Sequence, residues 1–462
     1  MLFIPFFCHL CSTKIQTMKG DKKVIRGWVF YDWANSVYNL VISSAIFPIF
    51  YSNITKQHYL EQNPDLVWKE GMPVFVDFFK MQIDADTLIA YVFSASFLTI
   101  SLLSPILSGV ADYSGAKKRF MQFFCYLGAL ACISLYWFDP NNMELGMLSI
   151  FFASIGFWSS FVFYNAYLPE IAEPDDHDRI SARGYSMGYF GSMILLIICL
   201  AMIMGIDKSY TKYSFILVGL WWMGFAQITF RVLPSSKSKG VVDRKILFKG
   251  FGELKLVFKE FSKTVRLKKY LRSFFFFNTG VQTVMLMAVY FAKKAIVWPD
   301  DAADSGLIIA ILLIQLLGAA GAYLMSFVST KIGNLKTLRI VVVGWILICI
   351  YAYFITLPYQ FYILAVGVGL VMGGVQALAR STYSKFLPET TDTASYFSFY
   401  DVTEKLGIVL GTLFYGLMYQ LTGNIRMSVV SIAAFFVIGF ILLILVPREE
   451  TGEVKGGYVD NE

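Results

Sequence analysis

The sequence predicts an all-α polytopic membrane protein with twelve transmembrane helices in two pseudo-symmetric six-helix halves. Apolar residues make up 57% of the chain and charged residues 15%. The apolar residues come in blocks of about 20, the length that spans the roughly 30 Å hydrocarbon layer of a bilayer as a helix. Two loop motifs also recur about half a chain apart. Because backbone hydrogen bonds must close within each spanning segment, a helix bundle is the expected architecture.

The chain divides by composition into five segments, beginning with a short N-terminal stretch. Residues 1–23 are expected on the cytoplasmic side, and 1–17 are interpreted as a gene-model extension before an initiator at Met18. The other segments are a first half, a basic linker, a second half and a cytoplasmic tail, at 24–232, 233–270, 271–447 and 448–462. The predicted spans lie at 27–51, 86–110, 120–138, 144–167, 184–205, 213–232, 272–297, 305–328, 338–357, 361–382, 397–420 and 425–447.

Positive charge gathers in alternate connections between the spans. Assigning the connections in turn to the two sides places most of the 39 Lys and Arg residues on the side that holds both termini. Such loops stay cytoplasmic, so both termini are predicted to be cytoplasmic. The net charge of +7 therefore reflects topology and does not indicate a nucleic-acid partner. The short central linker favours a bacterial cytoplasmic membrane.

The cysteines predict neither a disulfide framework nor a metal centre. Cys8 and Cys11 form a CxxC pair without a second pair elsewhere to complete a zinc site. Four others lie inside predicted spans, where a thiol packs as a small hydrophobe: Cys125, Cys132, Cys199 and Cys349. No cofactor is expected, and no Walker-type phosphate loop is found.

The first span carries a polar face. Asp32, Asn35 and Asn39 are spaced by three and four residues, so they share one side of a helix that is expected to face the central cavity. A carboxylate inside a span costs about 3 kcal/mol unless it meets a cavity or a partner. Asp32 is therefore a candidate proton carrier, substrate-amine ligand or gate. The alternative is a structural ion pair with Arg183 or Arg380.

A second charged group lies in the eleventh span. Asp401 and Lys405 are four residues apart and would pair within the helix, which leaves Glu404 to find a partner or a proton. Glu404 is therefore the proton-coupling candidate in this span. Other polar residues expected within spans complete the candidate substrate pathway: Asn278, Gln282, Gln376 and Arg380.

Two loops repeat between the halves. Between spans two and three, Gly109-Val-Ala-Asp112-Tyr-Ser-Gly115 is followed by Ala116 and Lys117-Lys118-Arg119. Its Ser108, Val110, Gly115 and Lys118 recur as Ser326, Val328, Gly333 and Lys336. Between spans four and five, Tyr164-Asn-Ala-Tyr-Leu-Pro-Glu170 recurs as Tyr383-Ser-Lys-Phe-Leu-Pro-Glu389. Repeats of this kind are typical of secondary transporters, whose substrate site lies between the repeats.

These motifs resemble major facilitator transporters. The 109–119 loop is similar to the signature loop between their second and third helices. Tyr31-Asp-Trp-Ala-Asn35 resembles the opening of the vacuole-effluxer-like family, as do Arg183-Gly-Tyr185, the segment 374–381 and Phe399-Tyr-Asp401. That family includes fungal autophagy-related vacuolar amino-acid exporters and a bacterial branch. The resemblance implies the major facilitator fold and amino-acid efflux.

The same resemblance implies a gate at the cytoplasmic side. Asp112, with Gly115, Lys118 and Arg119, would latch that side by placing the acid near the positive end of a neighbouring helix. The other expected gating residues are Arg183, Asp401 and Lys405. In the second half Thr330 replaces the acid, so the second latch is expected to be weakened or lost.

The linker contains a candidate amphipathic helix. Its apolar residues recur at helical spacing between Lys and Glu: Leu247, Phe251, Leu254, Phe258, Phe261 and Val265. Such a helix is expected to lie on the inner leaflet and to tie the halves together.

These observations predict a secondary transporter rather than an enzyme. We expect a monomer that moves a small solute, most simply an exported amino acid, by alternating access with proton coupling. A sugar or drug facilitator is the alternative within transport. The acidic loop with Asp175 and Asp178 suggests a second alternative, a membrane-embedded metal-dependent transferase. A scaffold or sensor without transport is a third.

Overall fold

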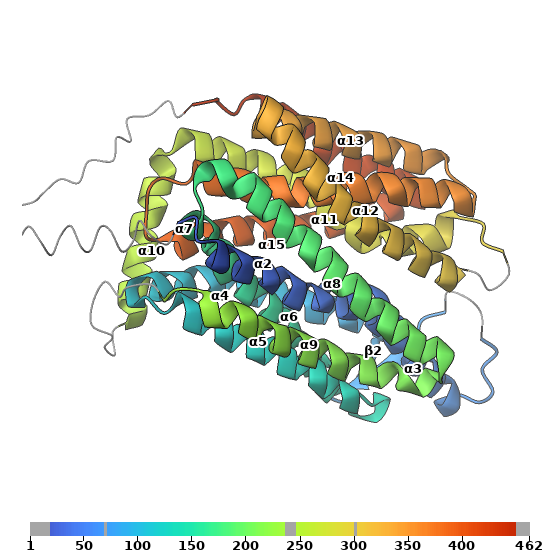
Figure 1. The fold of residues 1–462 in the computed structure, drawn as a ribbon. Helices are drawn as coiled ribbons and strands as arrows, with labels where there is room; N and C mark the ends of the chain where they lie inside the picture. The colour runs from blue at the N-terminus through green and yellow to red at the C-terminus, as the bar shows by residue number, and fades with distance from the viewer. Residues whose placement is uncertain (1–18, 69–71, 236–245, 300–302, 450–462) are drawn as a thin grey trace, which may run out of the picture.

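The computed structural model describes residues 19–68, 72–235, 246–299 and 303–449. The extension at 1–17, the Cys8 and Cys11 pair, and most of the tail lie outside these residues. Within them, twelve long helices run roughly along one direction as a bundle (Figure 1). Apolar runs of this length form helices because a helix satisfies its backbone hydrogen bonds internally.

The first half contains one composite helix and five further long helices. The composite helix comprises α2 (Lys22–Val37), the π-helix η1 (Tyr38–Ala45) and α3 (Ile46–Gln62). The others are α4 (Ala85–Ser114), α5 (Lys117–Ser134), α6 (Met143–Ala166), α8 (His177–Gly205) and α9 (Thr211–Val232). Short helical turns lie in the connections, at Leu135–Trp137, Pro140–Asn142, α7 (Leu168–Ile171), Pro174–Asp176 and Lys208–Tyr210.

The second half contains six long helices. They are α11 (Val265–Ala295), α12 (Ala303–Ile332), α13 (Asn334–Phe354), α14 (Pro358–Phe386), α15 (Thr393–Thr422) and α16 (Ile425–Ile444). Eleven long helices of the described chain are apolar enough to cross a membrane by length and composition. The remaining one is α15, whose apolar sequence Asp401, Glu404 and Lys405 interrupt, yet it packs within the bundle against α4, α6 and α11. The predicted all-α polytopic fold is confirmed.

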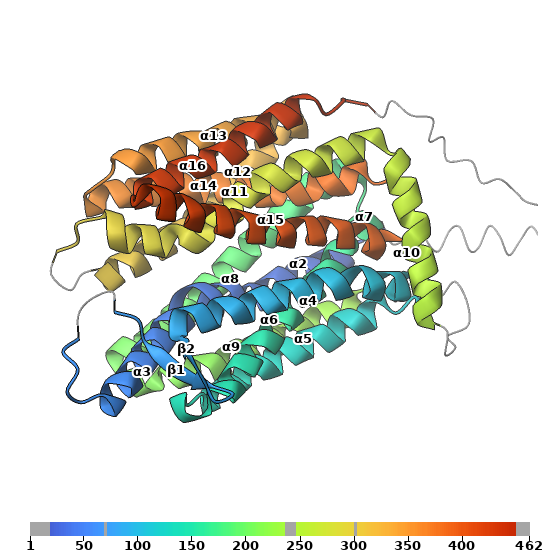
Figure 2. The ribbon, with the colours of Figure 1, turned by 180° about the vertical axis from the view of Figure 1, so that it is seen from behind.

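The two ends of the bundle differ. One end, here called the linker end, carries the short helix α7, and α10 (Ile246–Lys263) runs across this end (Figure 2). The opposite end, here called the hairpin end, carries β1 (Phe75–Phe78) and β2 (Met81–Asp84). Between the halves, α8 packs on α12 and α14, and α4 and α6 pack on α15.

The first span and its following loop differ from the prediction of a span at 27–51. The helix continues to Gln62, and an antiparallel hairpin follows in which Phe75 pairs with Asp84. Phe79 and Lys80 form its turn with φ of 47° and 63°, the left-handed region that hairpin turns need. Sequence patterns assign such turns to Gly, Asn or Asp, so a Phe-Lys turn gives no signal and the hairpin was missed.

The linker helix α10 joins the two halves at the linker end. It packs on α4, and the rings of Phe258 and Phe261 lie 6.0 and 5.5 Å from that of Phe399 on α15. Val257 is buried, whereas Phe251 and Phe258 are exposed. Leu247 lies among the residues whose side chains are not described.

Candidate functional site

An ion pair between the halves lies at the centre of the candidate site. Asp32 Oδ2 on α2 lies 3.3 Å from Nη2 and 3.4 Å from Nη1 of Arg380 on α14. Tyr164 of α6 donates a 2.7 Å hydrogen bond to the same oxygen. Both charged side chains are at most 2% exposed. Of the two partners expected for Asp32, the structure selects Arg380, because Arg183 is exposed.

Every donor group of the Arg380 guanidinium is engaged. Nε donates to Ser181 Oγ and Nη2 to the Ser181 carbonyl, both at 2.9 Å, while Nη1 donates to Asn165 Oδ1 at 3.2 Å. The guanidinium carbon lies 4.1 and 4.8 Å from the ring centroids of Tyr185 and Trp28. These aromatic rings and the hydrogen-bond partners compensate the large cost of burying this charge.

Glycines on α8 make the ion pair possible. A Cβ at Gly184 would lie 2.3 Å from Asp32 Oδ2, and one at Gly188 would lie 2.4 Å from Ser36 Oγ. These two residues lie one turn apart on α8, so its bare backbone forms the surface against which α2 packs.

The other predicted residues of the first span have separate surroundings. Asn35 is fully buried, and its Nδ2 has no hydrogen-bond partner among the described residues. Asn39 lies in the π-helix η1 and is exposed. Only Asp32 of the predicted polar face therefore joins the ion pair.

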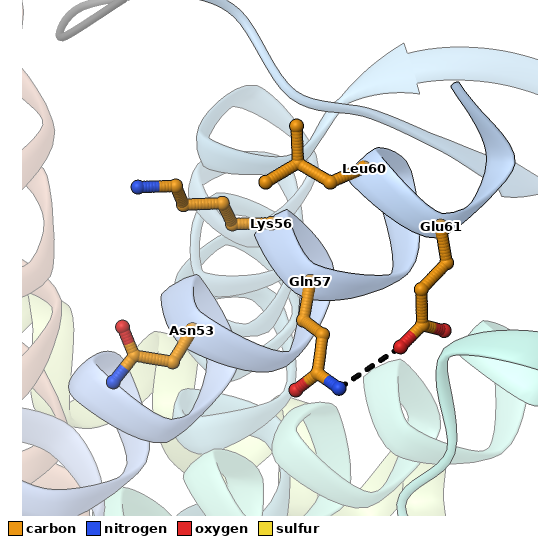
Figure 3. Close-up of a pocket in the computed structure, with 5 residues that line it drawn as sticks. All are labelled: Asn53, Lys56, Gln57, Leu60 and Glu61. Atoms are coloured by element: carbon orange, nitrogen blue, oxygen red, sulfur yellow. Dashed lines mark hydrogen bonds between the residues drawn. The ribbon is translucent and has the colours of Figure 1, made fainter. Parts of the chain in front are cut away.

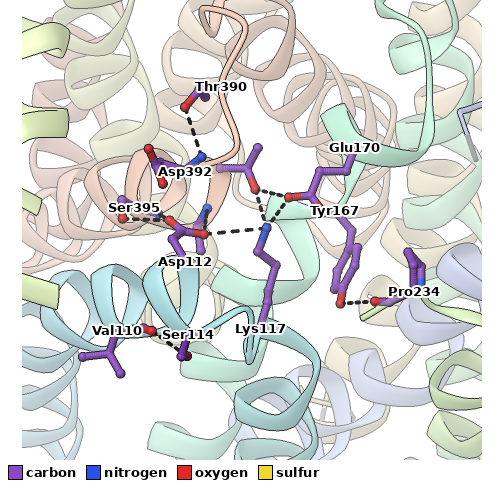
Figure 4. Close-up of polar contacts among 12 residues, drawn as sticks. Val110, Asp112, Ser114, Lys117, Tyr167, Glu170, Pro234, Thr390, Asp392 and Ser395 are labelled. Atoms are coloured by element: carbon purple, nitrogen blue, oxygen red, sulfur yellow. Dashed lines mark hydrogen bonds and ion pairs between the residues drawn. The ribbon is translucent and has the colours of Figure 1, made fainter. Parts of the chain in front are cut away.

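The first cluster at the linker end places Asp112 at the start of α15 (Figure 4). Its carboxylate accepts from the backbone N–H of Ala394 at 3.3 Å and from the N–H and hydroxyl of Ser395 at 2.7 and 2.8 Å. The first N–H groups of a helix have no partner within it, and an acid there also meets the positive end of the helix dipole. A first-half carboxylate thus caps a second-half helix.

Lys117 holds this cluster together, whereas Lys118 and Arg119 were the basic residues expected there. Its Nζ contacts Glu170, lies 2.5 Å from Thr393 Oγ1 and lies 3.8 Å from Asp112 Oδ1 (Figure 4). Lys118 instead donates to the Leu233 carbonyl after α9, and Arg119 is exposed. The three basic residues are consecutive, so helix orientation alone determines which one faces the other half.

Gly115 serves the predicted turn between α4 and α5. It ends α4 with φ of 65°, a left-handed conformation that glycine adopts without strain. Its counterpart Gly333, between α12 and α13, has φ of 86°.

A second cluster at the linker end corrects the expectation that the second latch is weakened or lost. Asp178 on α8 accepts from Ser329 Oγ at 2.8 Å and from Asn334 Nδ2 at 2.6 Å, and Lys385 Nζ lies 2.7 Å away. Thr330 does replace the acid in the second-half loop, but the facing first-half helix supplies a carboxylate instead. The sequence analysis noted Asp178 only as part of the acidic loop of the transferase alternative, and not as a partner of the second half.

The acidic loop does not gather its carboxylates into a metal site. Asp178 is buried in the cluster just described, Asp175 is exposed, and Asp176 pairs with Arg179 at the surface. Within the described ranges, no group of three or more His, Cys, Asp or Glu residues is placed to hold a metal ion.

A third cluster lies in α15, and it confirms the expected pairing of Asp401 with Lys405. Lys405 Nζ lies 2.9 Å from Asp401 Oδ1 and 3.2 Å from Glu404 Oε2, so it bridges both acids. Gln282 Nε2 of α11 donates to Glu404 Oε1 at 2.9 Å. Glu404 therefore has partners for both oxygens. The Lys405 ammonium also lies 3.4 Å from the centroid of the Trp158 ring of α6, a residue that sequence analysis did not identify.

The remaining predicted pathway residues lie apart from these ion pairs. Gln376 Oε1 accepts a 2.5 Å hydrogen bond from Tyr189 of α8. This bond joins the halves one helical turn before Arg380 on α14. Asn278 is buried, and its Nδ2 has no partner within the described part of the chain.

A depression in the surface lies away from all three clusters. It has a volume of about 390 Å³ and lies along one side of α3, lined by Asn53, Lys56, Gln57, Leu60 and Glu61 (Figure 3). Gln57 donates to Glu61 across it at 2.9 Å. One helix supplies the whole lining, so this surface does not bring the two halves together.

Comparisons with known proteins agree with this architecture. The chain is 28% identical to an uncharacterised major-facilitator-type transporter, YxiO of Bacillus subtilis, over 95% of this chain and 98% of that protein. It is 22% identical to autophagy-related protein 22-1 of Penicillium rubens, over 93% and 90% of the two chains. The fold matches the proton:xylose symporter XylE with a TM-score of 0.67 at 12% identity, over 92% and 95%.

YxiO is described as a transporter of the major facilitator type, and the fold is that of the XylE symporter, which confirms the prediction that the protein is a transporter and not an enzyme. The predicted multi-pass membrane protein is confirmed as well. The sequence profile described as "Vacuole effluxer Atg22 like" matches residues 20–454. The chain therefore belongs to the vacuole effluxer Atg22-like family of major facilitator transporters.

Proposed function

We propose that this transporter exports amino acids by alternating access, with proton coupling, across a bacterial cytoplasmic membrane. The observation that carries the proposal is the set of buried ionic contacts between the halves. Asp32 with Arg380, Asp112 with the start of α15, and Asp178 with Lys385 each join a first-half helix to a second-half segment.

These contacts lie on the linker side of the bundle. Two of the clusters are at the linker end itself, and Asp32 lies about 15 Å along α2 from its start there, at 1.5 Å per residue. If the linker end is cytoplasmic, as the distribution of positive charge predicts, this arrangement is closed toward the cytoplasm. Release of substrate into the cytoplasm, or loading from it, would require all these contacts to separate together.

The substrate class rests on similarity. The family description and the fungal relatives name vacuolar efflux and autophagy, and the sequence resembles vacuolar amino-acid exporters. A zwitterion also suits a site that contains both signs of charge, because its carboxylate and ammonium each find an opposite partner.

Counterflow in proteoliposomes tests the proposal. Liposomes preloaded with unlabelled amino acids receive each labelled amino acid in turn, with wild type beside Asp32→Asn. Asp176→Asn is the matched control, because Asp176 is an acid of the same protein with a half-exposed side chain and a surface partner. We expect at least one amino acid to exchange in wild type and in the control, and exchange to fall at least about tenfold in Asp32→Asn, since Arg380 would lose its buried counter-charge.

The outcomes separate the parts of the proposal. Exchange of no amino acid by folded, monodisperse protein would exclude the substrate class and turn the search to sugars and drugs. Equal exchange by Asp32→Asn and wild type would show that the ion pair is structural and outside the transport cycle.

A further inference from the structure

The cluster on α15 carries unequal charge. It contains two carboxylates, Asp401 and Glu404, and one ammonium, that of Lys405. As whole residues, all three are at most 9% exposed, and they lie in a helix of a membrane-spanning protein. A net negative charge in such a place is costly, so the cluster must hold one further positive charge.

The hydrogen bonds indicate where that charge resides. Both oxygens of Glu404 are engaged, one by Gln282 and one by Lys405. Asp401 uses Oδ1 for Lys405, while its buried Oδ2 has no hydrogen-bond partner among the described residues. The hydroxyl of Ser104 on α4 lies beside the Asp401 carboxylate, close enough to interact with it but outside hydrogen-bond geometry.

We propose that Asp401 Oδ2 is an exchangeable cation site, which holds a proton when the transporter is empty and yields it when a substrate ammonium enters the cluster. This inference rests on the proposed amino-acid transport and names its coupling residue. The proton leaves Asp401 for water on the side to which the cluster is open. The arriving ammonium restores neutrality inside the cluster, and the substrate carboxylate must pair with a positive charge outside it, so one proton is released for each zwitterionic substrate bound.

The surroundings suit an ammonium group. The Trp158 ring already covers the Lys405 ammonium at 3.4 Å, and aromatic faces attract cations most strongly where water is excluded. Glu404 and Gln282 lie at the more accessible edge, because the Glu404 side chain is 11% exposed and Gln282 is half-buried. A substrate entering from that edge would meet a carboxylate before it reaches Asp401.

The charged groups that act on Asp401 are few. Among the described residues, Lys405 and Glu404, both on α15, are the acidic and basic side chains that interact with it. The neighbouring helices α4, α6 and α11 contribute Ser104, Trp158 and Gln282, none of which carries a charge. Tyr185 on α8 lies within electrostatic reach of both Glu404 and Arg380, which connects this cluster with the central ion pair.

Proton release measured on the purified transporter tests the inference. Protein in weakly buffered detergent with a pH-sensitive dye receives an equimolar mixture of L-amino acids with uncharged side chains. The same mixture with acetylated amino groups serves as the probe that lacks an ammonium. We expect wild type to release about one proton per bound substrate with the first mixture and none with the second. Asp401→Asn should release less than a fifth of the wild-type amount.

Two variants control for structural effects. Asp401→Glu keeps the titratable group and should release protons as wild type does. If Asp401→Asn does not fold, Asp401→Glu and wild type are compared with the acetylated probe, and equal release with that probe overturns the inference. Asp86→Asn changes an acid at the hairpin-end start of α4 and should release as wild type does.

The results distinguish this inference from the proposed function. If the amino-acid mixture neither raises the melting temperature of wild type nor releases protons, amino-acid transport itself is wrong and the inference fails with it. If the mixture stabilises wild type but releases no proton, or if folded Asp401→Asn releases as many protons as wild type, amino-acid binding stands and the assignment of Asp401 is overturned.

Discussion

At the scale of single residues, the missing side chain at Gly184 decides how the buried charges meet. Asp32 reaches Arg380 only because α8 presents bare backbone where a Cβ would lie 2.3 Å from its carboxylate and 3.0 Å from Nη2 of Arg380. The contact atoms belong to a rigid ion pair held by Tyr164 and Ser181, so they have little freedom to move away. The absence of a Cβ at Gly184 therefore allows the contact between Asp32 and Arg380, which are distant in the sequence.

Gly184→Ala should therefore destabilise the protein by about 1–3 kcal/mol, the usual cost of overpacking a buried site. Gly224→Ala on α9 is the matched control, because its Cβ would have nothing within 4 Å. That control should be neutral or up to about 1 kcal/mol stabilising, since alanine favours helix. Thermal unfolding in one detergent compares the two, and equal melting temperatures would contradict the tight contact at Gly184.

At the scale of elements, α15 begins on a carboxylate from another part of the chain. Its own preceding residue, Asp392, makes no side-chain cap to the first turn, whereas Asp112 of α4 accepts from the N–H groups of Ala394 and Ser395. The start of α15 is thus stabilised only while α4 is against it. Separation of the halves at the linker end would expose these N–H groups to water.

Asp112→Ala should speed amide hydrogen exchange of Ala394 and Ser395 about tenfold, in keeping with the roughly 1–2 kcal/mol that a cap contributes. Asp207→Ala is the control, because Asp207 accepts from the Ser209 N–H within a local turn in the first half. Its effect should stay at residues 208–210. Unchanged exchange at the start of α15 in Asp112→Ala would mean that water replaces the carboxylate without loss.

At the scale of the whole molecule, two clusters join the halves at the linker end. The acid lies at the end of a first-half helix in one cluster and at the start of a first-half helix in the other. In one, the acid belongs to the end of α4 and caps the start of α15. In the other, Asp178 belongs to the start of α8 and accepts from Ser329 and Asn334 around the α12–α13 corner. Both place the carboxylate in the first half, so the duplicated fold has two acidic contacts between the halves at this end although the duplicated acid is absent.

A covalent bridge across this closed end should stop transport. Glu170 and Thr393 come from different halves and their side-chain oxygens lie 2.6 Å apart, so Glu170→Cys with Thr393→Cys in a cysteine-free background should be bridged by a short, reducible bis-methanethiosulfonate cross-linker. We expect counterflow to fall at least about tenfold when the bridge forms, because the linker end can no longer open, and to recover on reduction.

The single-cysteine variants treated with the same cross-linker control for damage to the protein. Full counterflow by a quantitatively bridged protein would show that this end does not open during transport, and alternating access as proposed here would have to be abandoned.

The sequence by itself determined the class of fold, because long apolar blocks can satisfy their backbone in a bilayer only as helices. It also identified five charged residues that require a partner or a function, because buried charge is costly in any fold. They are Asp32, Asp112, Arg380, Asp401 and Lys405. The sequence did not determine which of these charged residues pair with one another. Which of three consecutive basic residues faces Asp112, and whether Asp32 meets Arg183 or Arg380, depend on helix rotation and on which helices lie side by side.

The tertiary structure alone decided those contacts and two others. It brought Trp158 over Lys405, because aromatic residues are so common in this chain that no pattern singles one out. It also placed Asp178 against the second-half corner, in a different repeat position from that of Asp112. The apolar pattern of a helix involves residues that are close in the sequence, so it can be read from the sequence. Charge pairs between helices depend on how the helices pack, so only the tertiary structure defines them.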